Sequence, residues 1–313
     1  MSIIFGPVPS RRLGKSLGVN NIPPKFCTYS CVYCQVGPTK NYLVARREFY
    51  SCKKIFNALK YTINELNNRD EKIDYISFVP DGEPTLDINI GKEIYLLKQF
   101  NIKIALITNG SLLWEKNLQD ELLILDYISV KIDAISETVW HRINRPHKGL
   151  EFSMVKEGVY EFRNKFKNKF VTETMLVKLN DSEEELNRIA KFLTKLSPDI
   201  AYIGVPVRPP TEVWAIPPNE GRIYLAYEIF KSHGLNTELL IGYEGSEFGA
   251  TGDAEKDLLS ITSVHPMREK EVRNLLRKDD SDWSVVKNLI RKGELVELNY
   301  QGESFFLRRL RNV

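Results

Sequence analysis

Three cysteines stand close together in the segment Pro23–Gln35. Cys27, Cys31 and Cys34 form a C-x3-C-x2-C array, and the aromatic residue Tyr33 directly precedes the third cysteine. Thiolates are soft ligands that suit iron–sulfur clusters, and three of them at this spacing can hold three corners of a cubane 4Fe–4S cluster. The fourth iron would then stay open for a substrate or cosubstrate. The spacing therefore favours an iron–sulfur site with one open iron.

Two other uses of clustered cysteines remain open at this point. A structural zinc site usually has four ligands, and no fourth cysteine or histidine follows here at ligand spacing. A disulfide framework is disfavoured because three clustered cysteines cannot all pair among themselves. The remaining cysteine, Cys52, stands at the start of a predicted helix, where a small packing residue is a better interpretation than a ligand.

The array with its aromatic residue resembles the signature of radical S-adenosylmethionine (radical SAM) enzymes. The wider segment FGPVPSRRLGKSLGVNNIPPKFCTYSCVYCQ is similar to a branch of Fe–S oxidoreductases that is distantly related to wyosine-synthase-like proteins, and the resemblance extends to near Pro210. It implies one 4Fe–4S cluster on the three cysteines, with SAM bound at the open iron. It also implies reductive cleavage of SAM to methionine and a 5′-deoxyadenosyl radical that modifies an unknown substrate, with flavodoxin or ferredoxin as the reductant.

Bulk composition bounds the class of protein. The chain has 313 residues, of which 42% are hydrophobic and 27% charged, and its net charge of +3 is too small to indicate nucleic acid by itself. Four cysteines favour a reducing compartment. The N-terminal residues do not resemble a signal peptide, and no apolar run approaches the roughly 18 residues of a membrane span. We therefore expect a cytoplasmic protein with no membrane association.

Six apolar runs alternate with helical patterns after a short N-terminal arm, Met1–Pro9. This alternation is typical of parallel βαβ units and predicts an α/β fold. The resemblance implies a partial (β/α)6 TIM-like barrel, in which the active site lies at the C-terminal ends of the strands. The predicted strands are Ser16–Ile22, Asp74–Val79, Ile102–Thr108, Leu125–Ile132, Phe170–Lys178 and Ile200–Val207.

Polar residues follow the second and third predicted strands. Asp81, Gly82 and Glu83 come first, and a glycine permits close backbone approach while carbonyls and an acid accept hydrogen bonds from an ammonium. The resemblance assigns this segment to the amino group of SAM. Thr108 and Asn109 end the third strand, where related proteins often contact the ribose or the methionyl group. The competing interpretation of Asn109 with its following glycine is an ordinary turn.

The fourth, fifth and sixth predicted strands supply the remaining candidates. Ser129, Lys131 and Asp133 share one face by the two-residue alternation of a strand. Lys131 could bind the carboxylate of SAM and Asp133 its amine or ribose, and the alternative is a structural ion pair inside the barrel. Val205 resembles the backbone segment that packs on adenine in related proteins. On the fifth strand, Glu173 and Lys178 are weaker candidates for the site.

Basic residues also gather near the expected open end of the barrel. Arg11 and Arg12 precede the first strand, Trp140–His147 follows the fourth, and Arg208 follows the sixth. Adjacent arginines can bind a carboxylate or phosphate in bidentate fashion, or they can be a solvated surface pair. We interpret these residues as a basic rim for an anionic substrate.

The composition changes after the glycine-rich segment Tyr243–Gly249. Three short helices are predicted at Ala254–Ile261, Arg268–Arg277 and Trp283–Arg291, followed by a hairpin. This order predicts a winged helix–turn–helix. We therefore divide the chain into a barrel (residues 1–234), a linker (residues 235–252) and a winged-helix-like domain (residues 253–313).

The role of this tail stays open between docking of peptide or protein, binding of RNA or DNA, and packing on the barrel. Its net charge from Ala254 onward is only +2, which is weak for nucleic acid. The exposed linker predicts that the barrel folds without the tail. The alternative is that the tail covers an apolar face of the barrel through Leu258, Leu259, Leu275, Leu289 and Phe306. A second functional hypothesis is a regulator that senses iron or redox state and binds DNA through the winged helix.

Overall fold

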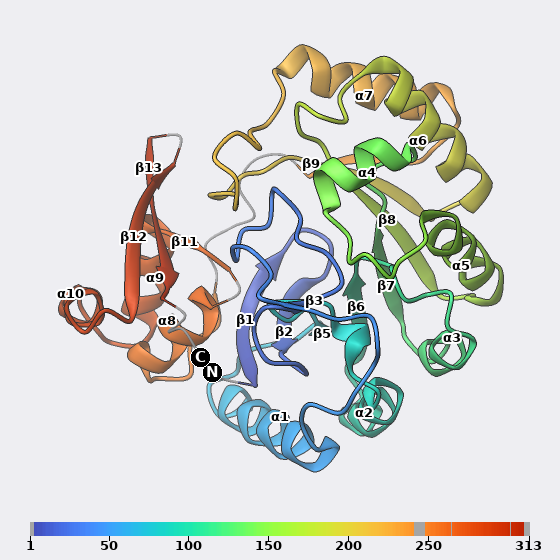
Figure 1. The fold of residues 1–313 in the computed structure, drawn as a ribbon. Coiled ribbons are helices and arrows are strands. Elements are labelled where there is room, and N and C mark those ends of the chain that lie inside the picture. Colours follow the sequence, from blue (N-terminus) through green and yellow to red (C-terminus); the bar gives the residue numbers. More distant parts are fainter. Residues whose placement is uncertain (1–2, 241–247, 264, 301, 310–313) are drawn as a thin grey trace.

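An eight-stranded sheet forms the larger part of the molecule (Figure 1). The computed structural model describes residues 3–240, 248–263, 265–300 and 302–309. In spatial order the strands are β1 (Ile4–Ser10), β2 (Gly14–Val19), β5 (Tyr75–Phe78), β6 (Lys103–Thr108), β7 (Tyr127–Lys131), β8 (Lys169–Met175), β9 (Ile200–Gly204) and β10 (Thr237–Leu240). Only β1 runs antiparallel to its neighbour. The six predicted strands are therefore present, in an α/β fold consistent with a partial barrel.

Helices connect the parallel strands and cover the outside of the sheet (Figure 1). They are α1 (Cys52–Asn67), α2 (Ile90–Leu97), α3 (Lys116–Leu122), α4 (Glu137–Asn144), α5 (Phe152–Lys165), α6 (Glu183–Leu196) and α7 (Glu220–Ser232), with 3-10 turns η1 (Pro84–Leu86) and η2 (Lys98–Phe100). Helix α1 shows the local logic: Ser51 caps it by accepting from the Lys54 amide, and Ile55, Leu59 and Ile63 recur on its buried face. Among the residues described, no helix is both long and apolar enough to cross a bilayer.

The two faces of the sheet bury different sets of side chains. Ile104 and Leu106 of β6 join the large core under the helices, whereas Ala105 between them joins a smaller cluster with Tyr127 on the opposite face. This follows from the alternation of side chains along a strand. Leu13, in the turn between β1 and β2, packs into the smaller cluster. The turn therefore fills part of the interior of the sheet.

Two strands of the eight-stranded sheet were not anticipated from the sequence. Residues predicted as a short arm form β1, whose prolines Pro7 and Pro9 are tolerated because β1 pairs only with β2 at the edge of the sheet. Residues Thr237–Leu240, predicted as linker, form β10 and pair in parallel with β9. The sheet therefore continues past the expected boundary at residue 234. A four-residue strand is too short to show periodicity, so its pairing decides its structure.

The chain from residue 248 onward forms a separate layer beside β1, drawn in orange and red in Figure 1. We call residues 248–309, as far as they are described, the C-terminal unit. It contains α8 (Ala254–Thr262), β11 (Met267–Arg268), α9 (Glu269–Lys278), α10 (Ser284–Arg291), β12 (Leu295–Tyr300) and β13 (Glu303–Arg308), with a sheet in the order β11-β13-β12. The three predicted helices and the hairpin are confirmed, and β11 was not predicted. Residues 241–247 of the predicted linker and Gln301 of the hairpin turn lie outside the described residues.

The C-terminal unit contacts the larger sheet at two places, at β1 and at the segment after β9. Phe5 and Val8 of β1 are buried in one apolar cluster with the five tail residues named above, Leu258, Leu259, Leu275, Leu289 and Phe306. The phenyl ring of Phe5 lies over Gly18 of β2, where an added Cβ would come within 2.0 Å of the ring. On the other side, the Tyr300 hydroxyl donates to the Pro206 carbonyl after β9 at 3.3 Å. The tail thus covers an apolar face of the barrel.

Candidate active site

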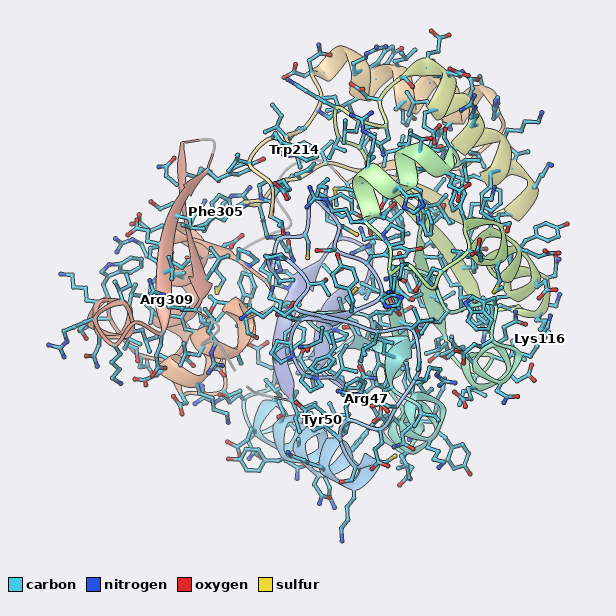
Figure 2. The ribbon with its side chains drawn as sticks, viewed as in Figure 1. Arg47, Tyr50, Lys116, Trp214, Phe305 and Arg309 are labelled. Carbon is cyan, nitrogen blue, oxygen red and sulfur yellow. The ribbon has the colours of Figure 1, made fainter. Side chains whose placement is uncertain are left out.

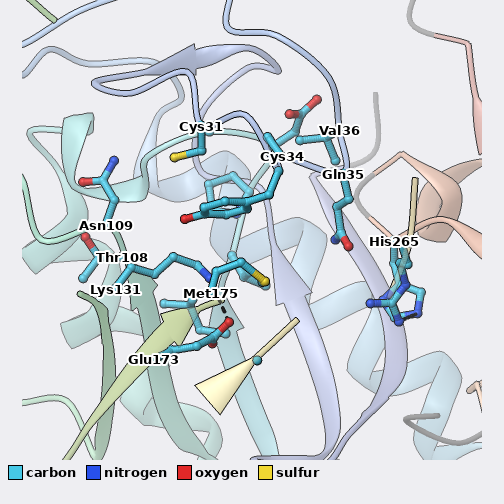
Figure 3. Close-up of a pocket in the computed structure, with 18 of the residues that line it drawn as sticks. Cys31, Cys34, Gln35, Val36, Thr108, Asn109, Lys131, Glu173, Met175 and His265 are labelled. Atoms are coloured by element: carbon cyan, nitrogen blue, oxygen red, sulfur yellow. Dashed lines mark hydrogen bonds and ion pairs between the residues drawn. The ribbon is translucent and has the colours of Figure 1, made fainter. Parts of the chain in front are cut away.

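The three cysteines lie on the loop that follows β2, which we call the cluster loop (residues 20–42). Within it β3 (Phe26–Cys27) pairs in parallel with β4 (Asn41–Tyr42). Cys27, Cys31 and Cys34 are free thiols, each half-buried, and all three line one cavity of about 330 Å³ (Figure 3). The cysteines therefore face a common space at the C-terminal ends of the strands.

Side-chain amides from two distant elements hold the thiols. The Asn109 amide, at the end of β6, donates to the Thr28 hydroxyl at 2.7 Å and approaches the Cys27 sulfur at 3.7 Å. The Asn144 amide, at the end of α4, approaches the Cys31 sulfur at 3.5 Å. Hydrogen-bond donors near sulfur stabilise a thiolate and fix its orientation.

The surroundings of the three thiols disfavour their thiolate forms unless a cation is bound nearby. Burial raises the pKa of each of the three thiols, and neighbouring carboxylates add to the rise. For Cys31 the pKa reaches about 12, with burial the largest cause and Asp133 the second. Thiolates form at such a site when a bound metal supplies positive charge, since metal ligation deprotonates cysteine.

The segment Asp81–Glu83 is pinned against the cluster loop. The Lys25 amide donates to the Asp81 carbonyl at 2.8 Å, and the Glu83 amide donates to the Phe26 carbonyl at 3.0 Å. A Cβ on Gly82 would lie 2.0 Å from that same Phe26 oxygen, so only glycine fits here. The close approach that the sequence suggested is thus made to the cluster loop. Burial raises the pKa of Asp81 to about 6, against the attraction of the Lys25 ammonium 3.4 Å away.

Glu83 directs its carboxylate into the protein. It accepts from the Thr85 hydroxyl at 2.6 Å, the Thr108 hydroxyl at 2.6 Å and the Asn109 backbone amide at 2.8 Å. Burial raises its pKa, and these hydrogen bonds oppose the rise. The carboxylate therefore ties the end of β5 to the end of β6, and its oxygens are already engaged by protein donors.

Lys131 lies on the floor of the cavity with two charged partners. Its ammonium is 2.8 Å from Glu173, which also pairs with Arg12, and lies 5.4 Å from the centroid of the Tyr33 ring. Burial acts to lower the pKa of Lys131, but attraction to Glu173 and Asp133 prevails and the pKa is raised. An ion pair is therefore present inside the barrel, but Lys131 pairs with Glu173 and not with Asp133, as the alternative supposed. Lys131 and Glu173 both line the cavity (Figure 3).

Asp133 and Ser129 are not among the residues that line this cavity. The Asp133 carboxylate accepts from the Tyr33 hydroxyl, from the Asn144 amide at 2.7 Å and from the Met175 backbone amide at 2.8 Å. Ser129 is fully buried. Asp133 therefore holds Tyr33 and Asn144, two residues next to the cysteines. Of these two, Tyr33 lines the cavity.

A loop after β9 covers the cluster loop from outside. The Thr211 hydroxyl donates to the Cys34 carbonyl at 2.8 Å, and the Glu212 amide donates to the Val32 carbonyl at 2.9 Å. Trp214 of the same loop stays partly exposed (Figure 2). Of the other candidates on the strand ends, Thr108, Asn109 and Val205 all line the cavity.

The expected basic rim is assembled in part. Arg11, Arg12 and Arg208 line the cavity, but the segment 140–147 does not. Trp140 is instead buried against Phe152, with ring centroids 4.7 Å apart, and Arg145 pairs with Glu212. Sequence reasoning missed His265 of the C-terminal unit, which also lines the cavity. No local signal could have found it, because its place depends on the packing of the tail.

The described residues show no group of three His, Cys, Asp or Glu side chains close enough to hold a single metal ion. In a cubane each thiolate binds a different iron, so its ligands stand farther apart than around one zinc ion. Three separated thiols lining one cavity fit a cluster better than a closed zinc site.

Comparison with known proteins decides the family. A family model described as the radical SAM superfamily matches residues 21–193. The chain belongs to the radical SAM superfamily. It is 45% identical to the UPF0026 protein MJ1312 of Methanocaldococcus jannaschii over 100% of this chain and 98% of that protein. Members of this superfamily use a 4Fe–4S cluster and SAM, so the predicted resemblance and the enzyme class are confirmed.

Solved structures of radical SAM enzymes share the fold. A radical SAM methyltransferase from Sphaerobacter thermophilus has a TM-score of 0.53 at 14% identity, over 72% of this chain and 66% of that chain. Streptococcus suis SuiB bound to the precursor peptide SuiA has a TM-score of 0.54 at 12% identity, over 72% of this chain and 49% of that chain. These likenesses support the partial barrel. None of these comparisons supports the alternative of a DNA-binding regulator, and the distant relation to wyosine-synthase-like proteins stays a prediction.

Proposed function

We propose that this radical SAM enzyme holds one 4Fe–4S cluster on Cys27, Cys31 and Cys34 and cleaves SAM reductively. The observation that carries the proposal is that three free thiols of one loop line the same cavity as the ends of the parallel strands. When reduced, such a cluster supplies the electron that splits SAM into methionine and a 5′-deoxyadenosyl radical. The protein's part is to hold the thiols, orient SAM and exclude water.

The cavity lining divides the work of binding SAM among strand ends. The backbone of Gly82 and the side chains of Thr108 and Asn109 are candidates for the polar groups of SAM, and Val205 for its adenine. Lys131 is the candidate for its carboxylate, as a cation 2.8 Å from Glu173 at the cavity floor.

Glu83, Asp133 and Ser129 receive different roles from those expected. The carboxylates of Glu83 and Asp133 already accept three or more hydrogen bonds from the protein, so we propose that both position neighbouring residues. Glu83 positions Thr108 and Asn109, and Asp133 positions Tyr33. Ser129 has no proposed contact with SAM.

Iron content and SAM cleavage test the proposal. Anaerobically purified protein should hold about four iron and four sulfide per chain. Cys27→Ala, Cys31→Ala and Cys34→Ala should each lose the cluster and the release of 5′-deoxyadenosine, while Cys52→Ala, at the first residue of α1 and outside the cavity lining, is the matched control. Zinc in place of iron, or loss of the cluster in the Cys52 variant alone, would show that the site is misassigned.

We propose that the C-terminal unit is a winged-helix-like domain. The order helix, strand, two helices and a two-stranded hairpin, with β11 joining the hairpin, supports this assignment. Its shared apolar cluster with β1 favours a role as a fixed wall over a freely docking module for RNA or peptide. The sequence contains four cysteines, too few for a second cluster beside the first, so a separate reductant such as flavodoxin or ferredoxin would deliver the electron.

A further inference from the structure

The cavity has a second end that the proposed binding of SAM does not use. Figure 3 shows Lys131 and Glu173 on one side of the pocket and His265 on the other. The far end is built by the segment after β9, which carries Arg208, and by His265 of the C-terminal unit. These two residues are far apart in the sequence, and no motif links them.

The C-terminal unit holds Arg208 in place. The Arg208 Nε donates to the Pro266 carbonyl at 3.2 Å, and its Nη2 lies 2.7 Å from the His265 Nε2. Since a guanidinium can only donate, the His265 Nε2 accepts, and the ring is neutral in this arrangement. The ring packs edge-on against Phe248 at 5.3 Å, and the His265 amide donates to the Ile261 carbonyl at the end of α8. His265 is therefore a positioning residue for Arg208.

The charge of the lining favours an anion at this end. Among the described residues that line the cavity, five side chains are cationic and three are carboxylates. Each carboxylate is engaged away from the His265 end: Asp81 faces Lys25, Glu173 pairs with Arg12 and Lys131, and Glu83 accepts from hydroxyl and amide groups of the strand ends. A cavity with excess positive charge and walls of low dielectric attracts anions.

The same contacts enclose this end. The C-terminal unit packs on Phe5 and Val8 of β1 and also reaches the segment after β9 through Tyr300 and Pro206. It therefore contacts both β1 and the segment after β9, which lie on different sides of the cavity. A cavity of about 330 Å³ that is bordered on both sides in this way is of a size that fits a small molecule.

We propose that the substrate is a small molecule whose carboxylate or phosphate group binds Arg208, with His265 orienting the guanidinium. This inference rests on the proposed function, because it places the substrate beside the SAM site. It assigns the far end of the cavity to an oxyanion of the substrate.

Binding of two probe anions to the reconstituted holoenzyme tests the inference. Inorganic phosphate is followed by 31P line broadening and acetate by 1H saturation transfer. Arg208→Gln should weaken binding about tenfold or more, because a charge-assisted contact is lost. Arg188→Gln, which removes an exposed guanidinium on α6 next to Glu184, is the matched control and should bind like wild type. Preference for phosphate or for acetate identifies the group of the substrate.

Two variants of His265 distinguish the orienting of Arg208 from a merely structural role of this side chain. His265→Gln keeps an acceptor for Arg208 and should retain binding, whereas His265→Leu should weaken it several-fold. Equal binding by wild type and Arg208→Gln would overturn the inference. If Arg208→Gln does not fold, equal binding by the two His265 variants would do so. Iron content and SAM cleavage of wild type from the same preparation test the proposed function separately.

Discussion

The cluster loop and the C-terminal unit both border the cavity, but different forces hold them. Polar contacts fix the cluster loop, as when the Glu83 amide donates to the Phe26 carbonyl and the Asn144 amide approaches Cys31. Apolar packing fixes the C-terminal unit, which shares one buried cluster with Phe5 and Val8 of β1.

Because of this difference, the cluster loop mainly determines the geometry of the site, whereas the apolar cluster mainly determines the stability of the fold. A single hydrogen bond contributes about 1 kcal/mol to the net free energy of unfolding, whereas a buried phenylalanine contributes several times as much. Changes in the cluster loop should therefore abolish chemistry in a folded protein. Changes in the apolar cluster should destabilise the fold even though most of its members lie outside the cavity lining, Phe5 and Val8 being the exceptions.

Deleting residues 248–313 should have the largest effect. The deletion exposes Phe5 and Val8 and removes most of one core, so we expect an aggregated or insoluble product. Cys34→Ala should be soluble and keep the far-UV circular dichroism spectrum of wild type. This expectation reverses the sequence-based one, in which the barrel folds alone. A soluble truncation with normal iron content would show that the tail is a separable domain after all.

Phe5→Ala tests the same interface by one side chain. Phe5 is 3% exposed and packs over Gly18 and against the C-terminal unit. We expect the free energy of unfolding to fall by about 3–5 kcal/mol, measured by urea denaturation. Tyr95→Ala, at a residue 72% exposed on α2, is the control and should change it by less than about 0.5 kcal/mol. Equal losses in both variants would remove the distinction between the two regions.

Asp133→Asn tests the polar side of the comparison. An amide has one acceptor oxygen, so it cannot satisfy the Tyr33 hydroxyl, the Asn144 amide and the Met175 amide together. We expect a loss of about 1–3 kcal/mol in the free energy of unfolding and lower iron retention. Glu173→Gln is the comparison variant, since the Glu173 carboxylate pairs with Arg12 and Lys131. Wild-type iron retention with reduced SAM affinity in Asp133→Asn would instead place Asp133 in direct contact with SAM.

The last prediction concerns the pH dependence caused by the buried pair Asp87 and Glu93, beside Asn21 at the start of the cluster loop. Burial, together with the charge of Asp87, raises the pKa of Glu93 to about 9. Burial also raises the pKa of Asp87, with Arg46 opposing and Glu48 adding to the rise. The folded state therefore binds more protons than the unfolded state, so stability falls as pH rises from about 4.5 to about 9.

Urea denaturation between pH 6 and pH 9 measures this dependence. Wild type should lose at most about 1.4 kcal/mol per pH unit, and Glu93→Gln should show a flatter profile. Lys103→Gln, on the opposite end of the sheet, is a control that should keep the slope of wild type. A Glu93→Gln profile as steep as that of wild type would assign the pH dependence to other groups.

Much of the site followed from residues close together in the sequence. The spacing of Cys27, Cys31 and Cys34 predicted the cluster loop, and the alternation of strands and helices predicted the sheet that carries it. The glycine at position 82 was predicted as a point of close backbone approach to SAM, and the structure shows a close approach to the Phe26 carbonyl of the cluster loop. These features are encoded by neighbours within a few residues, so a local pattern is enough to find them.

The partners of buried polar groups were decided only by the tertiary structure. Tyr33 meets Asp133 across 100 residues, and Arg208 meets His265 across 57. The sequence shows which residues can donate or accept, but a hydrogen bond requires two atoms within about 3 Å, and chain folding alone sets that distance. The same reason applies to Glu83. Its position after a strand predicted a contact with SAM, but in the folded chain its carboxylate accepts hydrogen bonds from Thr108 and Asn109 at the end of β6.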